Sequence, residues 1–171
     1  MDQPEYQIAP ARSESDVEAV RSLFTAYAEW LGLDLMYQGF AGELAGLPGI
    51  YAPPRGELLV ARDEHGVAVG CVGLRPLDAE GCCEMKRLYV APAARGAGLG
   101  RALVSAVIAE ATRIGYREIM LDSLPKLEQA TALYQRMGFR PIPPYYDTPV
   151  IATLFFSKRL ESEEPSRIER T

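Results

Sequence analysis

Hydrophobic and polar positions alternate along this chain with two different periods, and the change of period separates predicted helices from predicted strands. Between residues 17 and 31 large apolar residues recur at steps of three and four: Val17, Val20, Phe24, Tyr27 and Leu31. This spacing predicts one buried helical face. Ser13, three residues before Asp16, is typical of a capping box that begins such a helix, and Gly32 ends it.

From residue 57 onward the pattern becomes that of strands. Residues 58–62 and 67–74 flank the turn-like segment 63–66 and predict an antiparallel hairpin. Further strands are predicted over residues 5–9, 82–90, 118–122, 139–142 and 150–158, and further helices over 98–114 and 126–137. Residues 39–54 are rich in Gly and Pro but also apolar, so we expect a short helix and a folded loop that roofs a pocket. The order of elements predicts an α/β (α+β) fold, a mixed sheet with helices on its faces.

Composition narrows the class of protein. The 171 residues suit one domain, expected over residues 1–160, and the charged segment 161–171 is expected to be disordered. With 18 Lys+Arg against 23 Asp+Glu, the net charge of −5 disfavours nucleic acid as a partner. The apolar runs are too short to span a membrane, so a cytoplasmic location is expected. The three cysteines form no metal-ligand motif, and we predict no metal.

The most informative stretch is a loop with three glycines at alternate positions, Gly96, Gly98 and Gly100, between a predicted strand and a predicted helix. The first turn of a helix presents backbone N–H groups without partners and carries a partial positive charge. Glycines let an anion approach this backbone closely. The loop therefore predicts a phosphate or diphosphate site.

Two nucleotide motifs share this chemistry. The string required for a nucleotide P-loop does not occur. The dinucleotide pattern GxGxxG fails because Arg101 stands where its third glycine would fall, although Asp122 ends the next strand where a ribose-binding acid would stand. An NAD-dependent oxidoreductase therefore remains as a minor alternative.

A third pattern fits. Residues 88–92 read LYVAP and residues 95–100 read RGAGLG, which resembles the acyl-coenzyme A binding motif of the GNAT superfamily of N-acetyltransferases. Residues 130–139, ATALYQRMGF, resemble the helix that follows in that superfamily. The likeness covers about residues 57–160. It implies a mostly antiparallel sheet of about six to seven strands flanked by about four helices, with acetyl-CoA as cosubstrate.

The resemblance also implies functional residues. Main-chain groups of the strand before the loop would hold the pantetheine arm, and those of the loop would hold the diphosphate. The cofactor-binding residues implied are Leu88, Tyr89, Val90, Arg95, Gly96, Ala97, Gly98, Leu99, Gly100 and Arg101. One position departs from the family pattern, because Leu127 stands where many members carry Asn; Ser123 is the alternative polar group for that contact.

Two residues are predicted to move protons. Tyr134 matches the tyrosine that in the family protonates the leaving thiolate. Glu84 is the candidate base, because an alkyl amine is mostly protonated at neutral pH. Even alternation would place Glu84 on the strand face that carries Lys86, Leu88 and Val90. A plain ion-pair role for Glu84, with Lys86 or Arg87, is the alternative.

The acceptor is less visible in the sequence. Candidate acceptor-binding residues are Tyr27, Gln38, Glu43 and Tyr146, with Glu43 available to hold a cation. We predict an N-acetyltransferase that moves an acetyl group to a primary amine of a small molecule or amino-acid-like acceptor by direct attack in a ternary complex. A non-catalytic acyl-CoA sensor on the same fold is the alternative. The apolar segment 151–156 also allows a homodimer.

Overall fold

The computed structural model describes residues 5–32 and 39–161. Gln38, predicted to bind the acceptor, and residues 162–171 of the predicted tail lie outside the described residues.

The described residues form a seven-stranded sheet with the strand order β1-β2-β3-β4-β5-β7-β6. The strands are β1 (Gln7–Pro10), β2 (Glu57–Arg62), β3 (Ala68–Pro76), β4 (Cys82–Val90), β5 (Glu118–Ser123), β6 (Arg140–Pro141) and β7 (Leu154–Arg159). Neighbouring strands are antiparallel except β4 and β5, which are parallel. The predicted mixed, mostly antiparallel sheet is therefore confirmed.

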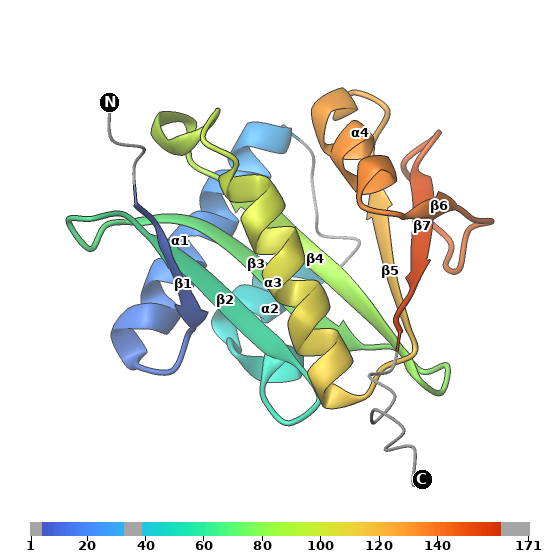
Figure 1. Ribbon diagram of the computed structural model, residues 1–171, viewed down its shortest axis with the longest axis horizontal. Coiled ribbons are helices and arrows are strands. Elements are labelled where there is room, and N and C mark those ends of the chain that lie inside the picture. Colours follow the sequence, from blue (N-terminus) through green and yellow to red (C-terminus); the bar gives the residue numbers. More distant parts are fainter. Residues whose placement is uncertain (1–4, 33–38, 162–171) are drawn as a thin grey trace, which may run out of the picture.

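Helices cover both faces of this sheet (Figure 1). They are α1 (Glu14–Leu31), α2 (Phe40–Ala45), α3 (Leu99–Ile114) and α4 (Glu128–Arg136), with short 3-10 turns at η2 (Gly49–Tyr51) and η3 (Pro92–Ala94). One core cluster joins α3 and α4 to the sheet and includes Leu103, Ile119 and Tyr134. The other joins α1 to the opposite face and includes Phe24 and Tyr89. The sheet thus separates two sides of the molecule, the α3/α4 side and the α1/α2 side.

Local signals in the sequence account for several boundaries. Ser13 Oγ accepts from the amide of Asp16 at 3.0 Å, and Asp16 Oδ2 accepts from the Ser13 amide, so α1 begins at the predicted capping box. Asp63 Oδ1 accepts from the amides of His65 and Val67 at 2.9 Å each and closes the predicted hairpin turn. The last strand begins at Leu154 rather than near 150, because residues before it form a turn.

A β-bulge in β4 changes which side chains share a face. Cys71 of β3 faces Tyr89, whereas Gly73 faces Lys86, so β4 carries one extra residue between these pairs. Arg87 lies in this bulge with a φ of +60°, a conformation that non-glycine residues rarely adopt. As a result Leu88 packs on the α3/α4 side.

The bulge corrects one prediction. Met85 belongs to the core on the α3/α4 side, so alternation directs Glu84 to the α1/α2 side. The expectation that Glu84 shares a face with Leu88 and Val90 was wrong, because Leu88 and Val90 both pack against the α3/α4 core. An inserted residue reverses the alternation of every side chain that follows it.

The apolar segment 151–156 is largely used inside the fold. Phe155 and Phe156 are buried, since β7 lies between β5 and β6 rather than at the edge of the sheet. The homodimer therefore stays a prediction, but the apolar strand on which it was based is not an exposed edge strand. Of the helices that the structure describes, none has the length and apolar character needed to cross a membrane.

Candidate active site

The sheet opens between β4 and β5. These parallel strands pair only at Cys82, Cys83 and Glu84 of β4, which face Glu118, Ile119 and Met120 of β5. Beyond Glu84 the described part of β4 continues to pair with β3 alone. The backbone of β4 from Met85 to Val90 therefore has one ladder side that no described strand occupies. A pocket lies in this gap.

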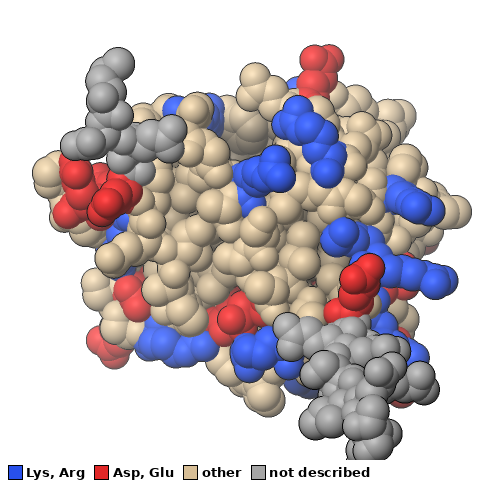
Figure 2. Space-filling view, viewed as in Figure 1, with Lys and Arg blue, Asp and Glu red and all other residues tan. Residues whose placement is uncertain are grey.

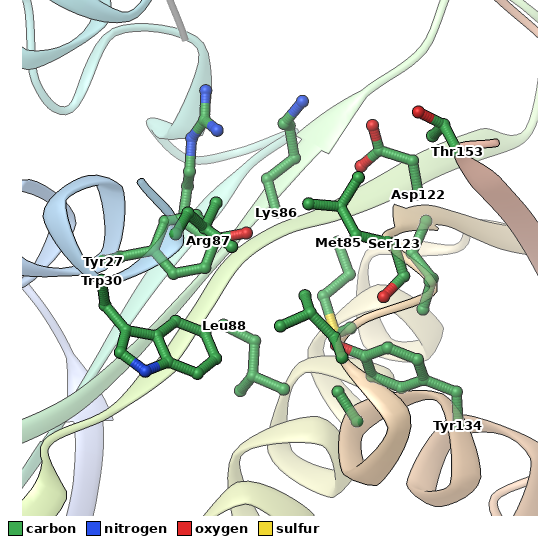
Figure 3. A pocket seen from close by; sticks show the side chains of 15 residues that line it. Tyr27, Trp30, Met85, Lys86, Arg87, Leu88, Asp122, Ser123, Tyr134 and Thr153 are labelled. Atoms are coloured by element: carbon green, nitrogen blue, oxygen red, sulfur yellow. The ribbon is translucent and has the colours of Figure 1, made fainter. Parts of the chain in front are cut away.

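The pocket is lined by residues from α1, β4, β5, α4 and the segment before β7. They are Tyr27, Trp30, Leu31, Met85, Lys86, Arg87, Leu88, Leu121, Asp122, Ser123, Leu124, Leu127, Ala130, Tyr134 and Thr153. Figure 3 shows that Lys86, Arg87 and Asp122 extend to one side of the strands, whereas Ser123 and Tyr134 lie on the other side. The gap is therefore lined from both sides of the sheet.

Tyr134, which is predicted to take part in the reaction, reaches the pocket from α4. Its ring packs against Phe139 and Phe156 with centroid separations of 5.8 and 6.4 Å, which fix its orientation. Burial, together with the negative charge of Asp122 and the neighbouring Tyr27, raises the pKa of the Tyr134 hydroxyl above its ordinary value of 10.0. The hydroxyl therefore stays protonated at neutral pH.

Glu84 lies beside the pocket, where β4 and β5 are still paired, and its side chain is fully buried. Arg75 Nε donates to Oε1 at 2.7 Å, and the Tyr145 hydroxyl donates to Oε2. Lys86 Nζ lies 3.7 Å from Oε1. Both carboxylate oxygens thus have partners. The ion-pair role that was the alternative for Glu84 is therefore present, with Arg75 and Lys86 as the cations.

Glu43 and Arg87 form a buried ion pair on the α1/α2 side. Arg87 Nε and one terminal nitrogen contact the two oxygens of Glu43 at 3.0 and 3.3 Å, and the Arg87 side chain is only 3% exposed. Its guanidinium also stacks on Phe40 of α2, 5.1 Å from the ring centroid. The cation that Glu43 holds is therefore Arg87, and its predicted binding of an acceptor cation would have to compete with this pair.

Tyr146 and Tyr145 come from the segment between β6 and β7 and contact the two carboxylates nearest the gap. The Tyr146 hydroxyl donates to Asp122 Oδ2, while Tyr145 donates to Glu84. Both rings pack edge-on against Phe155 at 5.2 Å. Tyr146 is therefore connected to the pocket by its contact with Asp122, which lines the pocket. Tyr27, also predicted to bind the acceptor, lines the pocket directly from α1.

The glycine loop lies between η3 and α3. Gly96 and Gly98 have φ values of +88° and +78°, and a Cβ built on either would meet no atom within 4 Å. Their conformation requires glycine, and the space beside them is open. Gly98 precedes the first turn of α3, where Leu99, Gly100 and Arg101 present amide groups at the positive end of the helix dipole. Figure 2 shows Lys and Arg side chains on this face near α3 and α4.

Arg95 does not extend into this loop. Its Nε donates to the carbonyl of Val90 at 3.0 Å, and its guanidinium stacks on Trp30 and Tyr89 at 5.0 and 5.8 Å from the ring centroids. The side chain of Tyr89 is itself turned toward Tyr27 and Trp30 of α1. Arg95 and Tyr89 thus join α1 to the outer end of β4, beside the opening of the pocket.

Leu127, at the position where the family pattern has Asn, and Ser123, the alternative polar group, both line the pocket. Leu127 lines the wall and precedes α4. The Ser123 side chain is buried and, among the described residues, its hydroxyl has no hydrogen-bond partner. Buried hydroxyls without partners are rare, and this one faces a pocket. Ser123 therefore suits a polar ligand group on the α3/α4 side.

The parted strands, the glycine loop and the buried tyrosine suit a transferase that uses an anionic acyl carrier. Comparison with known proteins agrees. The profile of the acetyltransferase (GNAT) family matches residues 17–139. The chain belongs to this family and is an acyltransferase, and the family implies an acyl-CoA cosubstrate and a small-molecule acceptor. The oxidoreductase alternative is therefore set aside.

Individual relatives cover most of the chain. An uncharacterized N-acetyltransferase of Schizosaccharomyces pombe is 43% identical over 143 residues, which span 84% of this chain and 88% of that protein. The IAA acetyltransferase of Azospirillum brasilense is 35% identical over 154 residues, 88% of this chain and 96% of that protein. The crystal structure of a Klebsiella pneumoniae protein described as an acyl-CoA N-acyltransferase is 29% identical, with a TM-score of 0.72 over 91% of this chain and 98% of that one.

Several residues of the pocket were not singled out from the sequence as part of the site. Lys86, Arg87, Asp122 and Thr153 line it. The adjacent tyrosines at 145 and 146 were a visible signal, but their partners lie in strands far away in the sequence. Asp122 was visible as the last acid of a strand and was considered only as a ribose ligand.

Proposed function

We propose that this chain transfers an acetyl group from acetyl-CoA to a primary amine of a small-molecule or amino-acid-like acceptor, by direct attack within a ternary complex. The observation that carries the proposal is the gap between β4 and β5, which is lined from both sides of the sheet. Tyr134 enters it from the α3/α4 side, and Asp122 and Lys86 lie on the other side (Figure 3). Two reactants held on opposite sides can meet there without a covalent enzyme intermediate.

The α3/α4 side fits acetyl-CoA. The diphosphate would bind the amides of residues 96–101, because they present unpaired donors and a positive helix end. The pantetheine arm would pair with the main chain of Leu88, Tyr89 and Val90, whose outer ladder side has no described strand partner. The unpartnered hydroxyl of Ser123 lies along the same route and supports this assignment.

Tyr134 supplies a proton in this proposal. When bound, acetyl-CoA presents a thioester acyl group, from which an amide N–C bond forms as the C–S bond breaks. The Tyr134 hydroxyl donates its proton to the departing sulfur, and the tyrosinate regains a proton from the nitrogen of the adduct, which loses it as the amide forms. Burial keeps that hydroxyl protonated above its ordinary pKa, so the donor is available through the neutral and mildly alkaline range.

Glu84 is the proposed base. Removing the proton of an alkyl amine at pH 7 costs about 4.6 kcal/mol, which a positioned carboxylate offsets. Glu84 is on the α1/α2 side, next to the point where the strands part. Since Arg75 and Tyr145 engage both of its oxygens, the proton would reach it through a water molecule rather than directly.

The acceptor would bind on the α1/α2 side. Tyr27 lines the pocket there, and Tyr146 contacts Asp122, which also lines it. This arrangement supports an acceptor small enough to enter between α1 and the parted strands.

One variant tests the proposal cleanly. A Cβ at Gly100 would meet only Leu133 and Val90, at 3.9 and 4.0 Å, so Gly100→Ala fits the fold and adds a methyl group to the first turn of α3, where the diphosphate would bind. Acetyl-CoA should raise the Tm of the wild type, and Gly100→Ala should weaken its binding at least tenfold. Gly42→Ala, at an exposed helical glycine with open space around it, is the matched control. Equal binding by Gly100→Ala, or no thiol release from acetyl-CoA with any amine, would contradict the proposal.

A further inference from the structure

Asp122 lies at the gap but has no place in the mechanism above. It follows Leu121 on β5, two residues beyond Met120, the last residue paired with β4. Leu121 is buried in the core on the α3/α4 side, so alternation directs Asp122 to the opposite side. Figure 3 shows its carboxylate on the same side as Lys86 and Arg87, away from Tyr134. Asp122 is half-buried and lines the pocket, so it can contact an acceptor.

The carboxylate is positioned by a neutral partner. The Tyr146 hydroxyl donates to Oδ2, and the Tyr146 ring is itself held edge-on by Phe155 and Tyr145 at 5.2 and 5.5 Å. A phenol can orient a carboxylate without cancelling its charge. Within the described part of the chain, Oδ1 has no hydrogen-bond or ion-pair partner. Tyr146 therefore fixes where the negative charge lies.

No cation within the described residues forms an ion pair with Asp122. Arg87 is paired with Glu43, and Arg75 is paired with Glu84, from which Lys86 Nζ lies 3.7 Å. A half-buried carboxylate at a pocket, paired only with a phenol, favours a cationic ligand. The ligand that enters this side of the gap in the proposed reaction is an amine, which is an ammonium ion at neutral pH.

The position of Asp122 also suits the geometry of transfer. Its charge is close enough to Tyr134 to contribute, after burial and Tyr27, to the raised pKa of that hydroxyl. Asp122 and Tyr134 line the same pocket from opposite sides of the sheet. An amine at Asp122 and a sulfur at Tyr134 would therefore face each other across the gap.

We propose, building on the N-acetyltransferase function above, that Asp122 binds the protonated amine of the acceptor and so selects aliphatic primary amines that are cations at neutral pH. Tyr146 is the positioning residue for this carboxylate. Asp122 increases acceptor affinity through its charge. The proton is removed from the amine afterwards, by the base discussed above.

The test compares amines that differ in charge but hardly in size. Linear alkylamines from ethylamine to hexylamine are used beside analogues of the trifluoroethylamine type, in which a CF3 group on the amine-bearing carbon leaves the amine mostly unprotonated at neutral pH. Asp122→Asn retains a carbonyl oxygen for the Tyr146 hydroxyl and removes only the charge. The variant should raise KM for the protonated amines at least tenfold, leave KM for the fluorinated amines within twofold, and leave acetyl-CoA binding unchanged. Tyr146→Phe, which keeps the charge, should raise KM for the same protonated amines by a smaller factor.

Each outcome bears on the proposal. If the wild type releases thiol with amines and Asp122→Asn leaves their KM unchanged, or raises it equally for both series, the role of Asp122 is refuted while the acetyltransferase function stands. If Asp122→Asn does not fold, Asp122→Ser is measured in the same way, and an unchanged ratio of KM values between the two series refutes the role as well. If the wild type releases no thiol with any amine, the proposed function fails and this inference fails with it.

Discussion

The hydroxyl of Tyr145 donates a hydrogen bond to Oε2 of Glu84, a residue 61 positions earlier in the chain. Arg75 holds the other oxygen of the same carboxylate at 2.7 Å. The contact ties the segment before β7 to the end of the β4–β5 pairing, where the pocket begins. The carboxylate proposed as the base is thus fixed from two sides.

Replacement of Glu84 tests its role as the base. Glu84→Gln should lower kcat about a hundredfold and flatten the acid side of the pH–rate profile, because the group that accepts the amine proton is lost. Steady-state thiol release between pH 6 and 9 measures both effects.

Tyr145→Phe is the matched control for Glu84→Gln. It removes a hydrogen bond to the same carboxylate but keeps its charge and its Arg75 partner. We expect a loss of less than tenfold and an unchanged profile. If Glu84→Gln behaves like Tyr145→Phe, the role of Glu84 is structural.

Tyr134→Phe should lower kcat about a hundredfold while acetyl-CoA binds almost as tightly as before, since only the hydroxyl is lost and the ring contacts with Phe139 and Phe156 remain. Turnover is measured as free thiol and binding by calorimetry. Because burial raises the pKa of this hydroxyl above 10.0, Tyr134 should cause no loss of rate below that pH. Unchanged turnover in the variant would show that the hydroxyl takes no part in the reaction.

The Glu43–Arg87 pair should be important for stability. Glu43→Gln leaves a guanidinium that is 3% exposed without its carboxylate, which should cost about 3–5 kcal/mol in the free energy of unfolding. Urea denaturation measures this loss. The double variant Glu43→Gln with Arg87→Gln should be more stable than the single one, because no charge is left buried. If Glu43→Gln lowers the free energy of unfolding by less than about 1 kcal/mol, the pair contributes no more than an ordinary surface ion pair. Glu43 would then be free to bind an acceptor.

Acid should weaken the start of α1. A hydrogen bond from Arg62, with the backbone hydrogen bonds of the capping box, lowers the pKa of Asp16 from 3.8 to about 2. Since the folded-state pKa is the lower one, the stabilisation is complete above 3.8 and disappears as pH falls through about 2. Asp16→Asn should therefore lower stability by about 1 kcal/mol at pH 7 and approach no effect near pH 2. Glu14→Gln, in the same first turn but without the hydrogen bonds that Asp16 accepts, is the control, and equal behaviour of the two variants would contradict the assignment.

Local patterns in the sequence were enough for most of the fold. The capping box at Ser13, the turn at 63–66 and the glycine-rich start of α3 are decided by interactions between near neighbours, and the structure has them where the pattern places them. The glycine loop and the tyrosine of α4 were likewise visible. Their chemistry requires particular residue types at fixed spacing.

The acceptor side could not be predicted in the same way. The extra residue in β4 is defined by its register with β3, and no local pattern around Arg87 shows it. The partners of Glu43, Glu84 and Asp122 depend on which segments meet across the sheet. Charged residues on a strand look alike in the sequence, whether they bind a ligand or each other.

The early end of the β4–β5 pairing has a kinetic consequence. In the proposed reaction, a gap lined from both sides of the sheet would give each reactant its own entrance, so the acyl donor and the amine would not have to pass one another. Either one can arrive first, and each product can leave by the route its precursor used. The enzyme is then expected to show intersecting double-reciprocal plots in initial-rate measurements, rather than the parallel lines of a mechanism that stores the acyl group on the protein.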